Sequence, residues 1–337
     1  MTTIRDVAKR AGVAPMTVSR VINDSGYVSD STRSKVQDAI DELGYIPNML
    51  GPSLHLKQTN TLALVLTDIT NPFWTTVARG VEDAAHENGY SIILCNTDES
   101  LEKQDQYLTM LMRRRIDGIL LAPSHDSTEA VQRIQKQGTA LVVLDRSIAN
   151  AHVDMVRGDS LGGAIQLTRH LMDLGHQKIT ILAGPRDVST SVDRVKGFHL
   201  ALQEGGLTID DDAVKWGNFS HQSGYEMTRQ AFESSIRPTA LIATNNFIAI
   251  GALRALRELD LRVPEEISVV AYSDIPLGID PFPFLTVATH DDYDMGYQAT
   301  KLLLRRLSGE EQVEFQEIIM PAEIIIRQST AQVPELK

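Results

Sequence analysis

Polar and aromatic side chains gather directly after short apolar stretches of this sequence. Between residues 61 and 150 they are Asp68, Asn71, Phe73, Trp74, Asp98, Ser124, His125, Asp126, Asp145 and Arg146. Further along the chain they are Thr190, Arg194, Phe219, Asn245, Asn246, Ser273 and Asp274. Aromatic rings can pack against the C–H groups of a ligand, whereas carboxylate, amide and guanidinium groups can form bidentate hydrogen bonds with its hydroxyl groups. This combination suits a small ring that carries several hydroxyl groups.

The apolar stretches predict buried strands that alternate with helices. Strands are predicted at Leu62–Leu66, Ser91–Cys95, Gly118–Ala122, Ala140–Leu144, Lys178–Ala183, Ala240–Ala243 and Ile267–Tyr272. Helices between them are predicted, for example, at Phe73–Asn88, Leu101–Arg114, Gly162–Leu174, Thr190–Glu204 and Asn246–Leu259. This alternation is typical of parallel sheets covered by helices on both faces, which bind ligands beyond the carboxyl ends of their strands. The stretch is too long for one such sheet, so we expect two Rossmann-like halves.

The last third of the chain breaks the simple alternation. A strand at Leu285–His290 is followed by a helix at Tyr293–Leu307 and by strands at Phe315–Met320 and Glu323–Arg327. This order predicts that the chain crosses back between the two halves.

The N-terminal stretch predicts a helix-turn-helix. Apolar residues recur at helical spacing in two short segments, Ile4, Val7, Ala8 and Ala11, then Val18, Val21 and Ile22. Gly12 ends the first helix because it tolerates a positive φ, and Pro15 suits the first position of the second helix. The second helix of such a motif lies in the major groove of DNA. The alternative is a helical hairpin that only caps a larger domain.

The outward-facing residues of the second helix have side chains suited to DNA. Arg20 can bind guanine O6 and N7 together, and Pro15 and Met16 can touch a thymine methyl group. Thr17, Ser19 and Asn23 suit phosphate oxygens, which position the helix without reading sequence. A third helix is predicted from Ser29, as its N-cap, to about Leu43, and Tyr45–Asn48 then ends it.

Charge is unevenly distributed along the chain. The net charge is −12, which argues against a surface devoted entirely to nucleic acid. Residues 1–58 carry seven basic and six acidic side chains, whereas the rest carries 25 and 38. Only the first part can approach DNA without repulsion, and one copy would bind weakly. Dimerisation, which doubles the phosphate contacts, is therefore expected.

The order and spacing of the N-terminal residues match a known family. The matching segments are Asp6-Val7-Ala8, Ala11-Gly12-Val13, Thr17 to Asn23, Thr32-Arg33 and Leu43 to Asn48. The chain resembles the LacI/GalR family of bacterial transcriptional regulators, and the resemblance extends over residues 2–327. It implies a periplasmic-binding-protein-like core, with the effector-contacting positions Phe73, Trp74, Asp145, Arg194, Phe219, Asn245 and Ser273. Each position also has a structural explanation, such as packing for Phe73 and Trp74, an ion pair for Arg194 and helix capping for Asn245.

The hinge departs from the family pattern. The resemblance implies a hinge helix that forms on operator DNA and places Leu54 in the minor groove. Here Gly51-Pro52 stands where the family usually has Ala-Arg. A proline inside a helix costs about 3 kcal/mol, so we expect a helix that starts late or an irregular hinge that still delivers Leu54.

Two further departures concern the predicted effector site. Asn246 and Ser273 stand where the family usually carries aspartates, so Asp274 could replace one lost carboxylate, or the effector could carry fewer hydroxyls. Val188 stands where purine-binding relatives carry an arginine. A sugar-type effector is therefore favoured over a nucleobase or nucleoside.

Other classes of function are less well supported. Gly158-Asp159-Ser160-Leu161 matches the tetrapeptide of GDSL esterases, and Asp173 and His176 follow it. These groups are separated by one predicted helix and cannot meet, so no catalytic residue and no enzyme are expected. No clustered metal ligands or phosphate-binding glycine loop are found, so no metal or cofactor is expected. A transport-type sugar-binding protein remains the alternative without DNA function.

These observations predict a ligand-controlled regulator of transcription, most simply a repressor of sugar uptake or catabolism genes. The expected parts are a helix-turn-helix domain (1–46), a hinge (47–60) and an effector and dimerisation core (61–330). Within the core, we expect one subdomain at about 61–160 and 290–320 and another at about 161–289 and 321–330. The expected partners are palindromic operator DNA, a sugar-type effector and a second copy of the chain, with higher assembly left open. No segment is long enough to span a membrane, so the cytoplasm is the expected location.

Overall fold

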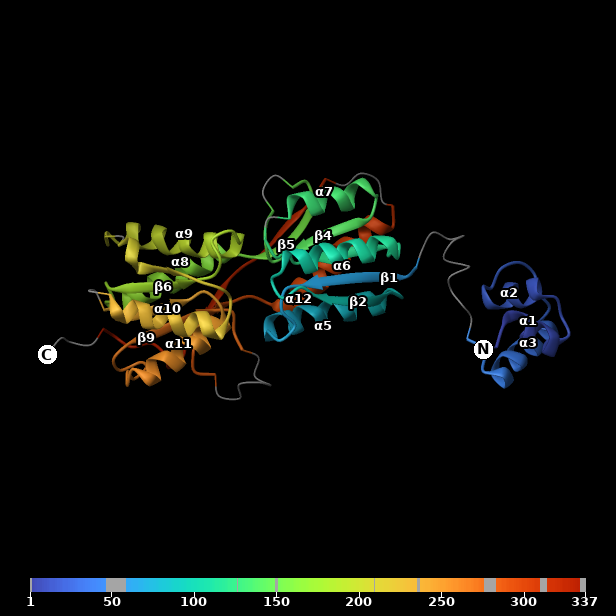
Figure 1. The fold of residues 1–337 in the computed structure, drawn as a ribbon, viewed down its shortest axis with the longest axis horizontal. Helices are drawn as coiled ribbons and strands as arrows, with labels where there is room; N and C mark the ends of the chain where they lie inside the picture. Colours follow the sequence, from blue (N-terminus) through green and yellow to red (C-terminus); the bar gives the residue numbers. More distant parts are fainter. Residues whose placement is uncertain are drawn as a thin grey trace. The chain divides into compact units, whose positions relative to one another are not determined.

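A computed structural model describes residues 2–46, 59–125, 127–148, 151–208, 210–234, 237–275, 283–309 and 314–333. The chain forms two compact units, Met1–Thr59 and Asn60–Lys337 (Figure 1). Among the described residues, no helix is both long and apolar enough to cross a membrane.

The N-terminal unit is a bundle of α1 (Ile4–Ala11), α2 (Pro15–Ile22) and α3 (Asp30–Leu43). Thr3 and Asp6 form a capping box at the start of α1, and Gly12 ends this helix with a φ of 69°. Pro15 is the first residue of α2, as predicted. Because the buried side chains of all three helices form one apolar cluster, the helix-turn-helix prediction is confirmed.

The predicted third helix is also confirmed, with Ser29 as its N-cap. It ends at Leu43, as predicted. Gly44, with a φ of 55°, caps the helix and turns the chain before Tyr45. Glycine therefore ends both α1 and α3.

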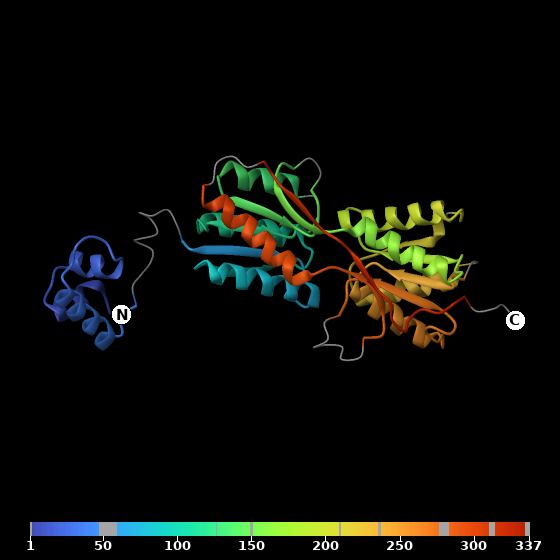
Figure 2. The ribbon, with the colours of Figure 1, turned by 180° about the vertical axis from the view of Figure 1, so that it is seen from behind.

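Two sheets of the same topology form the second unit (Figures 1 and 2). The first has the order β11-β5-β4-β3-β1-β2. Its strands are β1 (Thr61–Leu66), β2 (Ser91–Asn96), β3 (Gly118–Leu121), β4 (Ala140–Leu144), β5 (Asp154–Gly158) and β11 (Glu317–Met320). The second has the order β12-β10-β9-β8-β6-β7. Its strands are β6 (Ile179–Ala183), β7 (Val214–Trp216), β8 (Ala240–Ala243), β9 (Ser268–Tyr272), β10 (Thr286–Thr289) and β12 (Glu323–Ile325).

The strand pairing confirms the predicted pair of Rossmann-like sheets with two additions. All described pairs are parallel except that of β10 with β12, which is antiparallel. The short strands β5 and β7 were not predicted, because polar residues interrupt their apolar pattern. The chain passes from one sheet to the other after β5, after β10 and after β11, so the predicted crossing back is observed.

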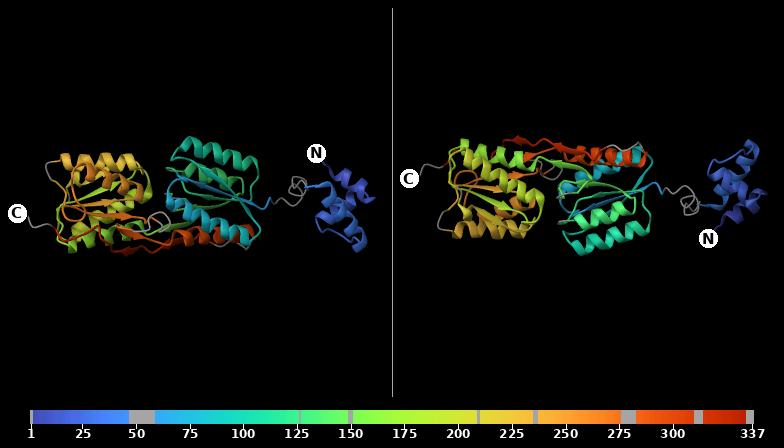
Figure 3. Two further views of the ribbon diagram at one scale, coloured as in Figure 1. Left: turned by 90° about the horizontal axis from the view of Figure 1, so that it is seen from below. Right: turned by 90° about the horizontal axis from the view of Figure 1, so that it is seen from above.

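Helices cover both faces of each sheet, as Figure 3 shows from two sides. In the first half, α5 (Pro72–Glu87) and α12 (Asp292–Leu307) pack on one face, and α6 (Leu101–Arg113) and α7 (Thr128–Lys136) on the other. In the second half, α8 (Ser160–Asp173) and α9 (Ser189–Glu204) oppose α10 (His221–Glu233) and α11 (Asn246–Glu258). A short 3₁₀ helix, η1 (Asp211–Ala213), precedes β7. This arrangement leaves the carboxyl ends of the strands free of covering helices.

Candidate functional site

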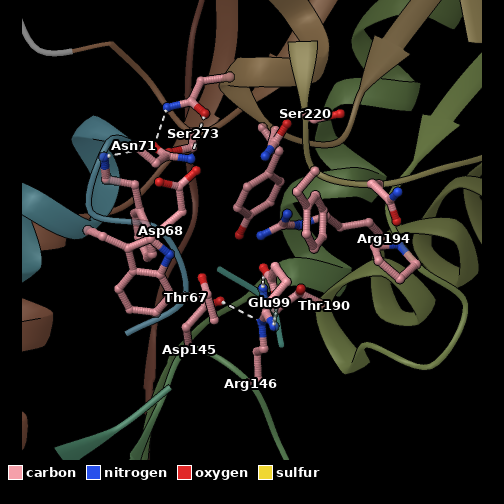
Figure 4. Close-up of a pocket in the computed structure, with 18 of the residues that line it drawn as sticks. Thr67, Asp68, Asn71, Glu99, Asp145, Arg146, Thr190, Arg194, Ser220 and Ser273 are labelled. Carbon is pink, nitrogen blue, oxygen red and sulfur yellow. Dashed lines mark hydrogen bonds and ion pairs between the residues drawn. The ribbon is translucent and has the colours of Figure 1, made fainter. Parts of the chain in front are cut away.

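A cavity of about 480 Å³ lies where strand ends of both halves meet (Figure 4). Its walls combine aromatic, charged, amide and hydroxyl side chains from both sheets. The lining residues are Thr67, Asp68, Asn71, Phe73, Trp74, Asp98, Glu99, His125, Asp145, Arg146, Pro185, Thr190, Arg194, Asn218, Phe219, Ser220, Asn245, Asn246, Tyr272, Ser273 and His290. The strand-end rule of parallel sheets therefore located this cavity from the sequence.

Most of the predicted effector positions line the cavity together. They are Phe73, Trp74, Asp145, Arg194, Phe219, Asn245 and Ser273. Asn245 is also the N-cap of α11, where its side chain accepts a hydrogen bond from the Ile248 amide at 2.8 Å. Asn245 therefore both caps a helix and lines the cavity.

Asp274 departs from the prediction. Its carboxylate forms a two-pronged ion pair with Arg327, with bonds of 2.8 and 2.5 Å, and it is not among the cavity-lining residues. Arg327 also donates to the Leu285 carbonyl at 2.9 Å. The idea that Asp274 replaces a lost carboxylate in the cavity is therefore wrong in this structure, because this carboxylate is committed to Arg327.

Four of the lining residues have left-handed backbones: Asp98 and Glu99, which follow β2, and also Asp145 and Ser273. Asp145 follows β4 with a φ of 62°, and Ser273 follows β9 with a φ of 72°. Such conformations are uncommon outside glycine and concentrate at functional sites. Each residue turns the chain so that its side chain can face the space between the sheets.

The arginines of the cavity are held in different ways. The buried guanidinium of Arg194 donates to the Thr244 carbonyl at 2.6 Å and stacks on the Tyr272 ring at 3.8 Å. Arg146 forms a bidentate pair with Glu99, with bonds of 2.7 and 2.5 Å, so its charge is neutralised locally. In Figure 4, Glu99 and Arg146 lie together near Asp145. Burial lowers the pKa of Arg194, which has no comparable carboxylate pair among the described residues.

Aromatic rings form an apolar wall. Phe73 and Trp74 meet edge to face at 4.7 Å, and Phe73 also lies edge-on to His290 at 6.0 Å. Across the cavity, Arg146 lies 5.6 Å from the centroid of the Phe219 ring. Burial raises the pKa of Tyr272 to about 12, so its hydroxyl stays protonated at neutral pH.

His290, Tyr272 and Glu99 were missed as site residues. Tyr272 ends β9 and His290 directly follows β10, so the strand-end rule would have found both. Burial lowers the pKa of His290 to about 4, and burial beside Asp145 and Asp291 raises the pKa of Asp292. The His290 ring is therefore neutral at pH 7. Among the described residues, no group of three carboxylate, thiol or imidazole side chains is placed to hold a metal ion.

The esterase-like tetrapeptide has a structural role. Asp159 caps α8 by accepting a hydrogen bond from the Gly162 amide at 2.8 Å. His176 instead contacts Thr239 and Ser268 through its two ring nitrogens, each at 2.9 Å. Asp159 therefore serves as a helix cap, and His176 is held by Thr239 and Ser268 rather than by the tetrapeptide.

The predicted DNA-contacting residues lie on or beside α2. Pro15, Met16, Arg20 and Asn23 are exposed, and Thr17 and Ser19 are partly buried. Asn23, just after the helix, donates to the carbonyl and hydroxyl oxygens of Ser19 at 2.9 and 3.2 Å. Leu54 and the Gly51-Pro52 departure lie outside the described residues.

Family models match both units of the chain. The model for periplasmic binding proteins and the sugar binding domain of the LacI family matches residues 59–327, and the model for bacterial regulatory proteins of the lacI family matches residues 3–48. The chain belongs to the LacI family. It is therefore a DNA-binding regulator of transcription with an effector-binding core, rather than an enzyme.

Individual relatives agree with this assignment. The ribose operon repressor of Escherichia coli K12 is 35% identical over 309 residues, covering 91% of this chain and 94% of the repressor. The HTH-type transcriptional repressor PurR of Photobacterium profundum is 34% identical, with 98% of each chain covered. A lac repressor dimer bound to operator and the anti-inducer ONPF has a TM-score of 0.85 and 28% identity, covering 98% of this chain and 99% of that one.

Proposed function

We propose that this chain is a cytoplasmic, homodimeric repressor that binds palindromic operator DNA and is controlled by a sugar-type effector. One observation carries the proposal. One chain contains both a helix-turn-helix, on which Arg20 is exposed, and a separate cavity lined by aromatic rings, carboxylates and Arg194.

In this proposal, residues 1–46 bind DNA, 47–60 form the hinge, and 61–330 form the effector and dimerisation core. Pro15, Met16 and Arg20 read bases in the major groove, and Thr17, Ser19 and Asn23 contact phosphates. Leu54 of each copy enters the minor groove at the centre of the palindrome. The similarity to a lac repressor dimer bound to operator supports a dimer as the form that binds operator DNA.

The effector proposal rests on the chemistry of the cavity. Phe73, Trp74 and Phe219 offer faces to the C–H surface of a ring, while Asp145 and Arg194 offer an acceptor and donors for hydroxyls. The ribose operon repressor among the relatives supports a sugar, and the PurR relative makes a purine base the second candidate.

Effector control requires that the two sites share a conformational change. An effector that prefers one arrangement of the core halves shifts the population of that arrangement, and with it the affinity for DNA. We propose that the spacing of the two hinges in the dimer carries this coupling.

A screen of the full chain tests the effector class. Thermal unfolding is measured with D-ribose, other sugars, sugar phosphates, nucleosides and bases. A ligand at 100 times its Kd raises the free energy of unfolding by about 2.7 kcal/mol. Each kcal/mol raises the Tm by roughly 2–4 °C in a chain of this size. A shift with sugars supports the proposal, whereas a shift with bases alone replaces the sugar by a base.

The DNA-reading role is tested on operators selected from random palindromes. Arg20→Ala is expected to cost about 1–3 kcal/mol of binding and to relax preference at one base pair, because it removes a bidentate base contact. Lys35→Ala, on the exposed side of α3, removes a charge outside the recognition helix and serves as the control. An equal loss on all sequences with Arg20→Ala would mean that Arg20 contacts phosphate only.

A further inference from the structure

Two asparagines meet across the cavity between the halves of the core. Asn71 is the N-cap of α5 in the first half, and Asn246 is the first residue of α11 in the second half. Both are buried, with exposed fractions of 8% and 2%. They are 175 positions apart in the chain, so only the fold brings them together.

Their side-chain amides form a closed pair of hydrogen bonds. Nδ2 of Asn71 donates to Oδ1 of Asn246 at 3.1 Å, and Nδ2 of Asn246 donates to Oδ1 of Asn71 at 2.9 Å. Figure 4 marks the bonds at Asn71 with dashed lines. A reciprocal pair of this kind forms only when the two halves approach to within bonding distance.

Backbone donors fix which end of each amide is the oxygen. Oδ1 of Asn71 also accepts from the Phe73 amide at 3.0 Å, and Oδ1 of Asn246 also accepts from the Phe247 amide at 2.8 Å. Turning either amide would place an NH₂ group against a backbone N–H. The helix starts therefore hold both side chains ready for the partner.

An aspartate at position 246 could not form this pair. Its carboxylate would still accept from Nδ2 of Asn71, but its second interaction would place two acceptor oxygens together. One bond would be replaced by repulsion in a buried place, where an unsatisfied polar group is costly. Asparagine at 246 therefore makes a contact that the more usual acid does not.

We propose that Asn71 and Asn246 are positioning residues that hold the cleft closed before any effector binds. This rests on the proposed function only in taking the cleft as the effector site. A cleft that is already closed binds its effector more tightly, because the apparent Kd is the intrinsic Kd divided by the closed fraction. Asn71 also accepts a hydrogen bond from the backbone amide of Phe73, which lines the cavity.

Two other hydrogen bonds across the cleft are single bonds between residues that are more exposed than the asparagine pair. Ser189 accepts a hydrogen bond from the Ser147 amide at 2.8 Å, and His125 bonds to Asp187 at 2.6 Å. The Asp187 side chain is 58% exposed, so water competes for that bond. The asparagine side chains are buried, so water competes less for their reciprocal bonds, and we expect these bonds to dominate closure.

The test is a distance measurement on the full chain without any effector. Labels are attached to Glu102→Cys on α6 and Gln222→Cys on α10, which are exposed and lie in different halves; the native Cys95 is buried. Labelled chain is diluted with unlabelled chain so that a dimer carries one labelled copy. The distribution of distances then reports the closed and open populations.

The wild type is expected to give one short distance. Asn246→Ala is expected to reduce the ratio of closed to open molecules by about tenfold, in line with the loss of two hydrogen bonds. Asn71→Ser keeps an N-cap oxygen for α5 but cannot reach Asn246, so it is expected to open the cleft without losing the helix start. Asn88→Ala, at the far end of α5 where the side chain bonds to Ala84, is the control and should leave the distance unchanged.

Asn246→Asp separates the lost bond from added charge. If the pair acts as proposed, Asn246→Ala and Asn246→Asp both open the cleft. Opening by Asn246→Asp alone would assign the effect to repulsion among cleft carboxylates and overturn the proposal, as would distances that do not change in Asn246→Ala. Because no effector is present, neither result depends on whether the proposed effector class is right.

Discussion

The two halves of the core share one architecture and differ in the residues that fill it. Both sheets have the same strand order, and in both an aspartate caps the helix at a crossover, Asp159 before α8 and Asp291 before α12. In both, a left-handed residue follows the third strand from one edge and donates its amide to the neighbouring strand. Asp145 donates to Val156 at 2.9 Å, and Ser273 donates to Ala288 at 2.8 Å.

The first difference lies at those left-handed residues. Asp145 supplies a carboxylate to the cavity, whereas the equivalent Ser273 supplies only a hydroxyl. Both halves therefore share the left-handed backbone at this position, whereas the side chain, Asp145 or Ser273, differs and determines the chemistry of each cavity wall. The cavity is consequently more acidic on the wall formed by the first half.

The second difference lies at the residues before the two crossover caps. Gly158 precedes Asp159, and His290 precedes Asp291. The His290 ring packs against the Gly158 backbone so closely that a Cβ on Gly158 would lie 2.3 Å from Nε2 of His290. The first half leaves a space beside Gly158 that the His290 ring fills.

Alanine substitution of the helix-packing glycines tests whether the shared architecture is equally tight in both halves. A Cβ on Gly80 of α5 would lie 2.0 Å from the Tyr293 carbonyl oxygen on α12, and in the second half one on Gly197 of α9 would lie 2.4 Å from the Leu161 carbonyl oxygen on α8. Gly80→Ala and Gly197→Ala are each expected to lower the free energy of unfolding by about 3 kcal/mol, because backbone must move. Urea denaturation measures this, with Glu82→Ala on the exposed side of α5 as the control. A lower free energy of unfolding for only one of the two variants would show that the helices are not packed equally tightly in the two halves.

The contact between Gly158 and His290 is tested by a double-mutant cycle. Gly158→Ala should lower the free energy of unfolding by about 2 kcal/mol through overpacking. In the His290→Ala background the same change should cost much less, since the ring is gone. Equal costs in both backgrounds would show that Gly158 is needed for its own backbone rather than for His290.

Exchanging the left-handed residues tests their different chemistry with D-ribose as the probe. Ser273→Asp should lower the Kd about tenfold, because a carboxylate forms stronger hydrogen bonds to hydroxyls. Asp145→Ser should raise the Kd by a similar factor. Asn218→Asp adds the same charge elsewhere in the cavity and is the control for simple electrostatics. The Kd is measured by calorimetric titration, and an unchanged Kd in Ser273→Asp would show that Ser273 does not face the effector.

The smallest expected effect is a pH dependence at the crossover. Burial lowers the pKa of His290 from 6.5 to about 4, so its contribution to stability is present above pH 6.5 and is lost as pH falls toward 4. The raised pKa of Asp292 acts in the opposite sense, because the folded state keeps a proton that the unfolded state loses as pH rises. The two contributions partly cancel in the wild type.

His290→Gln removes one side of this balance. The difference in unfolding free energy between wild type and His290→Gln should increase with pH between 4 and 6.5. Urea denaturation at pH 4.5 and 7.0 measures it. A difference that stays constant would show that His290 does not change its protonation on unfolding.

The local patterns of the sequence were enough for the helix-turn-helix. Gly12, Pro15 and Ser29 each act within a few residues, through a turn, a helix start and a cap, so their effects need no distant partner. The same holds for the main strands and helices of the core. The strand-end rule then gathers most of the cavity residues, because parallel strands bring their carboxyl ends to one edge.

Contacts between distant residues were not accessible in this way. Asp274 was expected to face the cavity, but Arg327, which lies on the returning chain, binds it. β12 follows β11 closely and yet joins the other sheet in antiparallel pairing. Each outcome depends on where the crossovers bring the chain, and no local pattern encodes that.

The sequence by itself determined the family, the helix-turn-helix, the alternation of strands and helices, and the chemical types at the strand ends. These follow from periodicity, turn residues and spacing, which act over a few residues. Only the tertiary structure decided that Asn71 bonds to Asn246, that His290 fills the space beside Gly158, and that Arg194 stacks on Tyr272. Hydrogen bonds and packing depend on distances of a few ångströms between residues far apart in the chain, and such distances exist only after folding.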